Sequence, residues 1–421
     1  MVKYIESTML SVHIGVVEHG HSLFLRSSAE FQTRYMNIAP TLRIDIFGEG
    51  YIITDPVNIE TILSTRFEDF GLDSRRLRLM PLPGEGIFTD SDLTAFGEHT
   101  DMLLLALEHE SQKSAAVDLQ PHFFEYTLGT TTHLLFGEPH HNLPKKGRLA
   151  LRHNFDYATL ISAIRLHLSD LSYLCSPKNF QEACKVVRDW ATFFSDKALD
   201  FMEEHGEEAA KSSFIVNLWR DTRQRHDSLS AWLDILVRNP ELIERLKSEM
   251  ASAAIPDNGV LTGKHIQELP FLSTPSIPVA SCNFRIAFRT TVLPRGVGPD
   301  GESPVLIRNS VGHGWSTYHL HRHEAIYGTD ASIYRPSLWE DGDLIRKAGL
   351  GGFLDFHGGP RVCLGTEDYA IMEASYAIVR MLQKFPGIRL PPGVPNEPVG
   401  MKRQHLGIVL TSAEGAQVLL E

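Results

Sequence analysis

One ten-residue segment constrains this chain more than any other, and it reads Phe-His-Gly-Gly-Pro-Arg-Val-Cys-Leu-Gly from Phe356 to Gly365. It is a glycine-rich loop that delivers the thiol of Cys363 to the start of a predicted helix. The free N–H groups and the positive end of the helix dipole favour a thiolate there. Gly359 and Gly365 permit turns and close approach that a side chain would block. Arg361 adds a cation for an acidic group of a ligand. Such a loop is able to present a thiolate to a flat metal macrocycle.

The composition is that of a globular protein. The chain has 421 residues, of which 43% are hydrophobic and 22% charged, and can bury a large core. Its formal net charge of −12 argues against non-specific binding to nucleic acid. Four cysteines are too few for a disulfide framework and fit a reducing compartment. No run of about 20 apolar residues appears, so we expect neither a membrane anchor nor a secretory signal.

The first half of the chain mixes short strands with helices. Residues 41–46 and 51–54 are rich in β-forming side chains and flank a Gly-Glu-Gly turn, which predicts a hairpin. Pro56 suits the first position of a helix whose apolar face we expect to be Ile59, Ile62 and Leu63. Residues 70–92 are rich in Gly, Pro, Arg and Asp and are expected to form a long loop. Helical periodicity then predicts helices over 119–135, 156–167, 180–202, 229–237 and 241–250.

After residue 255 the pattern changes. Prolines and glycines become frequent, which predicts loops and short strands such as 291–293 and 305–307. A last helix is expected to begin near Cys363, because apolar residues recur mostly at steps of three or four. These residues are Ala370, Ala374, Ala377, Ile378, Met381, Leu382 and Phe385. The predicted fold class is mainly α with a small β part, in one large domain.

The cysteine loop resembles the haem-binding signature of the cytochrome P-450 superfamily at all of its fixed positions. These are Phe356, Gly359, Arg361, Cys363 and Gly365. The resemblance implies that Cys363 is the proximal thiolate ligand of haem iron, that Arg361 pairs with a haem propionate, and that Phe356 packs near the sulfur. The competing interpretation is a buried, inert cysteine in a glycine-rich loop, and five matched positions ahead of a helix favour the ligand.

The resemblance continues outside the loop. Residues 293–304 and the stretch 321–340 are similar to fungal members that act on long-chain apolar substrates. Ala370 and Glu373 stand where the family's last helix carries those residue types. Arg285 stands where members often place a second propionate-binding arginine, and the alternative for it is a surface arginine at a strand end. The resemblance implies a P-450-like fold over 1–421. Its parts would be an N-terminal β/α part (40–100), a helical part (101–255), a Pro/Gly-rich β and loop part (256–362) and the haem-loop helix (363–385).

Three motifs of the family are missing, which predicts a fold truncated by internal deletions. Residues 223–227 replace the oxygen-activating Ala-Gly-x-Asp/Glu-Thr-Thr motif, and we expect their His226 and Asp227 to be ordinary polar residues. The helix with the Glu-x-x-Arg pair is absent after Ser273. The Trp-x-x-x-Arg motif is also absent, and His99 in its place is expected to be a solvated helix residue. Two explanations fit, a degenerate non-catalytic relative or a gene with wrongly excised coding segments.

Three histidines offer a competing constellation. His319, His321 and His323 alternate, so that a strand would present all three imidazoles on one face, where they could bind zinc. The alternative is a polar strand or loop in which His321 takes the place of the family's usual histidine. No phosphate-binding loop and no Gly-x-Ser-x-Gly elbow occur, so nucleotide hydrolysis and that type of acyl transfer lack support.

The resemblance implies a haem-thiolate monooxygenase that hydroxylates an apolar small molecule, either fatty-acid-like or an intermediate of secondary metabolism. The cofactor would be Cys-ligated haem, and an NADPH-cytochrome reductase would supply electrons. We assign no catalytic side chain. The family implies the cytoplasmic side of the endoplasmic reticulum, and without a visible anchor a cytoplasmic location is the alternative. The alternative function is that of a degenerate, non-catalytic haem-binding or interaction protein.

Overall fold

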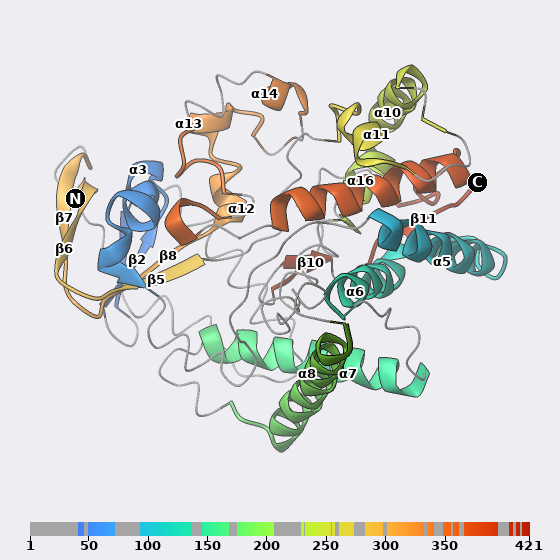
Figure 1. Ribbon diagram of the computed structural model, residues 1–421. Coiled ribbons are helices and arrows are strands. Elements are labelled where there is room, and N and C mark those ends of the chain that lie inside the picture. Colours follow the sequence, from blue (N-terminus) through green and yellow to red (C-terminus); the bar gives the residue numbers. More distant parts are fainter. Residues whose placement is uncertain are drawn as a thin grey trace.

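The computed structural model describes residues 41–45, 49–71, 93–136, 145–167, 175–205, 229–230, 232–253, 255–256, 261–272, 283–297, 301–331, 333, 335–340, 348–354, 357–361, 366–394, 404–406, 410–412 and 415–421. Helices dominate these residues, and a smaller group of strands gathers at one end (Figure 1). Both parts of the predicted fold class, mainly α with a small β part, are therefore present.

A five-stranded sheet joins the N-terminal part of the chain to a segment more than 200 residues away. In spatial order its strands are β1 (Thr41–Asp45), β2 (Glu49–Ile53), β8 (Gly312–Trp315), β5 (Asn283–Ala287) and β3 (Phe70–Gly71). β1 and β2 form the predicted antiparallel hairpin, with Thr41 opposite Ile53. β2 pairs with β8 in parallel, and the other pairs are antiparallel. Figure 1 shows these blue and orange segments together.

Glycines alternate with bulky residues along β8, and the two kinds of residue face opposite sides of the sheet. A Cβ on Gly312 would lie 2.3 Å from the ring of Phe284, and one on Gly314 would lie 3.5 Å from the same ring. Phe284 therefore occupies the glycine face. Because side chains alternate along a strand, His313 and Trp315 point to the opposite, buried face.

The helix after the hairpin begins as predicted. In α3 (Pro56–Glu60), the Asp55 carboxylate accepts a hydrogen bond from the Asn58 amide at 2.9 Å, and Pro56 occupies the first turn. The helix runs directly into one π-helical turn, η1 (Thr61–Thr65). Its predicted apolar face packs in one buried cluster with Tyr51, Trp315 and other sheet residues. Ile59 and Ile62 are fully buried, so α3 and η1 cover this side of the sheet.

The remaining helices form the larger part of the structure. They are α5 (Leu93–Ser111), α6 (Leu119–Phe136), α7 (Lys145–His167), α8 (Lys178–His205), helical residues 229–230 and 232–238, α10 (Pro240–Ser252), α11 (Gly263–Gln267) and α16 (Thr366–Lys384). α5 packs on α6 and on α16, and α7 packs on α8. Each helix that the periodicity predicted is present. Most ends differ by a few residues, but α7 begins at Lys145, 11 residues before the predicted start at 156.

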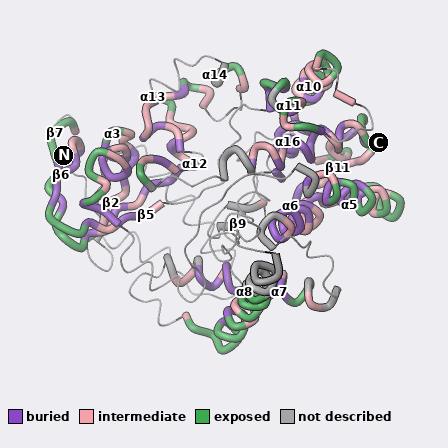
Figure 2. The backbone as a smooth tube through the Cα atoms, in the orientation of Figure 1, coloured by how far each residue is buried: buried purple, intermediate pink, exposed green. Residues whose placement is uncertain are grey.

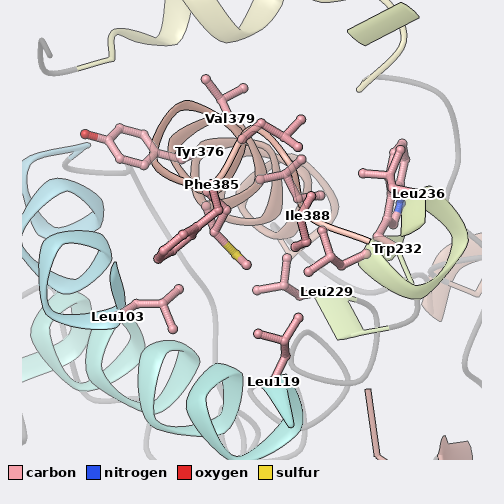
Figure 3. Packing of buried hydrophobic residues seen from close by; sticks show 14 of the residues in the cluster. Leu103, Leu119, Leu229, Trp232, Leu236, Tyr376, Val379, Phe385 and Ile388 are labelled. Atoms are coloured by element: carbon pink, nitrogen blue, oxygen red, sulfur yellow. The ribbon is translucent and has the colours of Figure 1, made fainter. Parts of the chain in front are cut away.

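The main hydrophobic core surrounds α16. Most of the apolar face predicted for this helix is buried in one cluster with residues of α5, α6 and 229–237, as Figure 3 shows for Phe385, whereas Ala374 is only partly buried. Tyr376 and Val379, which were not part of the predicted face, are buried in the same cluster. In the same cluster, the rings of Trp232 and Phe271 pack edge to face with 5.8 Å between their centres. Figure 2 shows buried residues along α6 and α16. α16 begins at Thr366, and residues 362–365 lie outside the described residues.

Short elements complete the fold. β6 (Thr291–Val297) and β7 (Ser303–Ile307) form an antiparallel hairpin that extends the two strands predicted there. The other short elements are η2 (Phe67–Asp69), α12 (Thr317–Leu320), α13 (Glu324–Tyr327), α14 (Ser337–Glu340), η6 (Gly359–Arg361), β4 (Val117–Asp118), β11 (Gln417–Val418), β9 (Gln404–Leu406) and β10 (Leu410–Ser412). None of the described helices has both the length and the apolar character that a membrane crossing requires.

Two local predictions are wrong. Phe70 and Gly71 belong to strand β3 and not to a loop, because Gly71 leaves room for the ring of Phe288 and the strand pairs with β5. The strand expected to carry three alternating histidines is the short helix α12 followed by a turn. The Ser316 side chain accepts from the His319 amide at 3.4 Å and so caps this helix, and the three histidines therefore do not alternate along one strand.

Candidate functional site

The upstream half of the cysteine loop is wedged against the turn that follows α3. Gly359 lies in η6 with φ +73°, and a Cβ there would stand 2.0 Å from the carbonyl oxygen of Leu63. A Cβ on Gly358 would meet Leu350 at 2.9 Å. Only glycine fits this approach at 359, both sterically and in its backbone angle. These contacts fix the position of the first part of the loop against the turn after α3.

The structure reaches part of the predicted site. Gly359 and the backbone of Arg361 are described as η6. Phe356, Cys363 and Gly365, and the side chain of Arg361, lie outside the described residues. Their roles therefore remain predictions.

Arg285 is buried, and its interpretation as a surface arginine at a strand end is wrong. It stands in the middle of β5 and is 6% exposed, because its register on β8 places it on the buried face beside His313. Its Nη1 donates to the Phe284 carbonyl at 2.9 Å. The guanidinium carbon also lies 5.8 Å from the centre of the Trp315 ring. A buried cation is thus held in a defined orientation at the base of the loop.

His357 links this arginine to the cysteine loop. The Nη2 of Arg285 donates to the Nε2 of His357 at 3.1 Å. The His357 ring also meets Trp315 edge-on at 6.1 Å. Sequence reasoning missed His357, because it fills a variable position of the loop signature. Its position directly after Phe356 was the only signal available.

His313 contributes an uncharged neighbour on the same sheet face. Its ring stacks on Tyr51 at 5.6 Å and meets the edge of Phe70 at 5.5 Å. Burial lowers the pKa of His313 to about 4, although the backbone near Arg285 and Val311 opposes this shift. The imidazole is neutral at pH 7, so it adds no second positive charge beside Arg285.

Two of the three alternating histidines make separate side-chain contacts. The Nδ1 of His319 lies 3.0 Å from the hydroxyl oxygen of Ser316. The Nε2 of His321 accepts from the Leu354 amide at 2.8 Å, and its ring stacks on Phe353 at 4.8 Å. Burial lowers the pKa of His321 to about 3 and that of His319 to about 4, and the charge of Arg322 adds to both shifts. Where residues are described, no three His, Cys, Asp or Glu side chains gather as metal ligands. The argument for zinc from alternation on one strand face therefore fails.

His99 is a buried residue, and the expectation of a solvated histidine is wrong. It is 3% exposed on α5, and its ring meets that of His133 on α6 at 5.4 Å. The Nδ1 of His133 lies 3.8 Å from the Glu98 carboxylate. His99 therefore belongs to the interface between α5 and α6, which its position on an apparently polar helix turn did not reveal.

Glu373 anchors the helix that follows the cysteine loop. It is 1% exposed, and its carboxylate accepts a short hydrogen bond from the hydroxyl of Thr130 on α6. Its backbone carbonyl accepts from the hydroxyl of Tyr126 at 3.2 Å. Ala370, one turn earlier, is also buried. Two side chains of α6 thus fix the axial position of α16. His226, Asp227 and residues 273–282 lie outside the described residues.

Curated relatives cover most of the chain, although no family model matches it. It is 34% identical to a cytochrome P-450 of Arthroderma benhamiae, over 89% of this chain and 82% of the relative. It is 31% identical to cytochrome P-450 52A5 of Candida maltosa (90% and 82%) and 30% to cytochrome P-450 52A13 of Debaryomyces hansenii (87% and 81%). Matches of this extent agree with the loop signature and with the mainly helical fold. The chain therefore belongs to the cytochrome P-450 family of monooxygenases, whose cofactor is Cys-ligated haem.

Proposed function

We propose that this chain hydroxylates an apolar small molecule, fatty-acid-like or an intermediate of secondary metabolism, with O2 and with electrons from an NADPH-dependent reductase. Cys363 ligates the iron, and Arg285 and Arg361 receive the two acidic side groups of haem. Phe356, Gly359 and Gly365 shape the loop that carries the cysteine. Bound haem supplies the oxygen-insertion chemistry, for which protein side chains have no equivalent. The reductase would meet the chain at the cytoplasmic face of the endoplasmic reticulum.

The observation that carries this proposal is the orientation of Arg285. Arg285 is 6% exposed, and its guanidinium is hydrogen-bonded to a backbone carbonyl and to His357 and packed near Trp315. An arginine held in this way presents its fork in one direction and suits a planar carboxylate. The donor set at the base of the loop therefore fits a cofactor with acidic side groups.

The chain's own residues position the cysteine loop. The contact of Gly359 with Leu63 fixes one end of the loop, and the bonds of Glu373 fix the helix at its other end. These two anchors would position the intervening segment, which carries Cys363.

The decisive experiment replaces Cys363 by alanine in the full-length chain reconstituted with hemin. We expect the absorption of the reduced, CO-bound variant to lose the thiolate-type Soret band. Cys184→Ala is the matched control, because Cys184 is buried in the separate cluster of Ala158, Ile161 and Phe180 and should leave the band unchanged. A thiolate-type band that persists in Cys363→Ala would overturn the assignment.

The substrate class requires a separate test. Saturated fatty acids of increasing chain length, added to the ferric protein, should shift the Soret maximum, and affinity should rise with each buried methylene by about 0.8 kcal/mol. Polar analogues of the same length serve as controls and should not shift it. Equal affinity for both series would contradict an apolar substrate.

A degenerate, non-catalytic relative is the second candidate, and the proposed internal deletions favour it. The first relative is aligned over 426 residues, whereas 89% of 421 is about 375, so about 50 of its positions face no residue here. Substrate-dependent consumption of NADPH with a reductase present would eliminate this candidate. Extra in-frame codons in the transcript after Asp101, Asp221 and Ser273 would instead indicate wrongly excised coding segments.

A further inference from the structure

The bond between Arg285 and His357 joins two regions that the sequence separates by 72 residues. Arg285 comes from the middle of β5, and His357 from the start of the loop that leads to Cys363. The contact is 3.1 Å long and lies beside Trp315, which touches both side chains. The geometry therefore couples the loop directly to the arginine.

The chemistry of the pair defines the state of His357. A guanidinium has donors and no acceptor, so the Nε2 of His357 must accept and carries no proton. The remaining proton is then on Nδ1, which lies 3.5 Å from the carbonyl of Gly358. His357 is thus a neutral acceptor in the tautomer with a protonated Nδ1.

We propose that His357 is a positioning residue that holds the guanidinium of Arg285 in the orientation needed to bind an acidic side group of haem. Two of the arginine's N–H groups are directed by protein acceptors, Nη1 by the carbonyl of Phe284 and Nη2 by His357. Trp315 restricts the guanidinium from one side. The guanidinium is thereby held in one orientation. The arginine side chain therefore loses less conformational entropy when it binds a carboxylate. This inference rests on the proposed haem site.

The backbone at His357 supports a specific role. His357 has φ +73°, a left-handed conformation that costs a side-chain-bearing residue about 1 kcal/mol relative to glycine. Glycine at 357 would avoid that cost, but it would remove the acceptor. The strained backbone is therefore combined with a side chain that makes a directed bond.

The experiment measures how fast the reconstituted full-length protein releases hemin to excess apomyoglobin at pH 7.5. His357→Phe keeps a ring and removes the acceptor, and should accelerate release about tenfold, as expected for one charge-assisted hydrogen bond. His357→Gln restores an acceptor oxygen and should release hemin within about threefold of the unchanged protein. His357→Gly also lacks the acceptor, and glycine tolerates the positive φ. This variant tests the same loss if the phenylalanine variant does not fold.

Two controls separate positioning from a structural bridge. His313→Phe replaces a ring on the same sheet face that stacks on Tyr51, and it should not accelerate release. The double variant His357→Phe/Arg285→Gln should release hemin no faster than Arg285→Gln alone, because His357 acts through the arginine. The inference would be overturned if the two substitutions accelerated release additively in the double variant. It would also be overturned if His357→Phe and His357→Gly released hemin at the wild-type rate. Either result would leave the haem site intact. Wild-type protein without a thiolate-type spectrum would overturn the proposed function as well.

Discussion

The hydroxyl of Thr291 donates to the carboxylate of Asp69 at 2.6 Å and so joins β6 to the turn that precedes β3. The same carboxylate accepts from the Nε of Arg289 at 2.5 Å. Asp69 is 8% exposed, so its charge is satisfied mainly by protein groups. This small network closes the side of the sheet next to the β6–β7 hairpin.

We expect Asp69→Asn to lower the free energy of unfolding by about 1–3 kcal/mol, measured by urea denaturation at pH 7, since a charge-assisted bond is lost. The Thr291 hydrogen bond lowers the pKa of Asp69, burial opposes this, and Arg289 and Arg66 lower it further. The stabilisation is present above the unfolded pKa near 4 and is lost as pH falls through the lower folded pKa. The difference between the two proteins should therefore shrink in acid. Asp189→Asn, in an exposed pair with Lys185, should change stability by less than about 1 kcal/mol.

Glu373→Ala should lower the free energy of unfolding by about 2–4 kcal/mol, because it removes a buried hydrogen-bonded side chain between α16 and α6. Glu373→Gln keeps an acceptor for Thr130 and should lose less. Glu244→Ala on the exposed side of α10 is the matched control and should change little. An equal loss in the alanine and glutamine variants would show that the Thr130 bond contributes nothing.

Stability should fall as pH drops from 7 to 5. Burial lowers the pKa of His313 and His319 to about 4 and that of His321 to about 3, whereas in the unfolded chain each titrates near 6.5. The unfolded state therefore binds protons first, and each such histidine costs up to about 1.4 kcal/mol per pH unit below 6.5. Urea denaturation at pH 7, 6 and 5 tests this, and His313→Phe should reduce the slope. Stability that stays constant over this range would contradict it.

Gly359→Ala should abolish stable haem retention, because its Cβ would stand 2.0 Å from the Leu63 carbonyl oxygen and its φ is +73°. Gly393→Ala is the matched control. Gly393 also has a positive φ of +83°, but a Cβ there would meet nothing within 4 Å. The control should therefore lose only the backbone penalty of about 1–2 kcal/mol. Hemin release at equal rates from both variants would show that the loop tolerates a shift at 359.

Local chemistry was sufficient to predict several elements from the sequence. The Gly-rich turn predicted the β1–β2 hairpin, and Pro56 predicted the start of α3. The apolar spacing of α16 predicted its buried face. In each case the information lies within one or two turns of chain, where propensity, capping and periodicity act together.

Long-range pairing was not predictable from the same patterns. The burial of Arg285 depends on β8 pairing with β5, and its contact with His357 depends on that burial. The alternating histidines gave a strand pattern, but the Ser316 cap favoured a helix. A short stretch of sequence does not reveal which strand, 28 residues away, will pair with it. It also does not reveal whether a helix cap or an alternating strand pattern will determine the local structure.

Gly312 on β8 limits which substitutions this sheet can accept. Any side chain at 312 would have to displace the Phe284 ring, which stands 2.3 Å from the position of its first carbon. Phe284 is the neighbour of Arg285 on the same strand, so that displacement would move the arginine and its whole hydrogen-bonded assembly. We therefore expect a side chain at 312 to weaken the proposed binding of haem by Arg285, although residue 312 itself has no proposed contact with the cofactor.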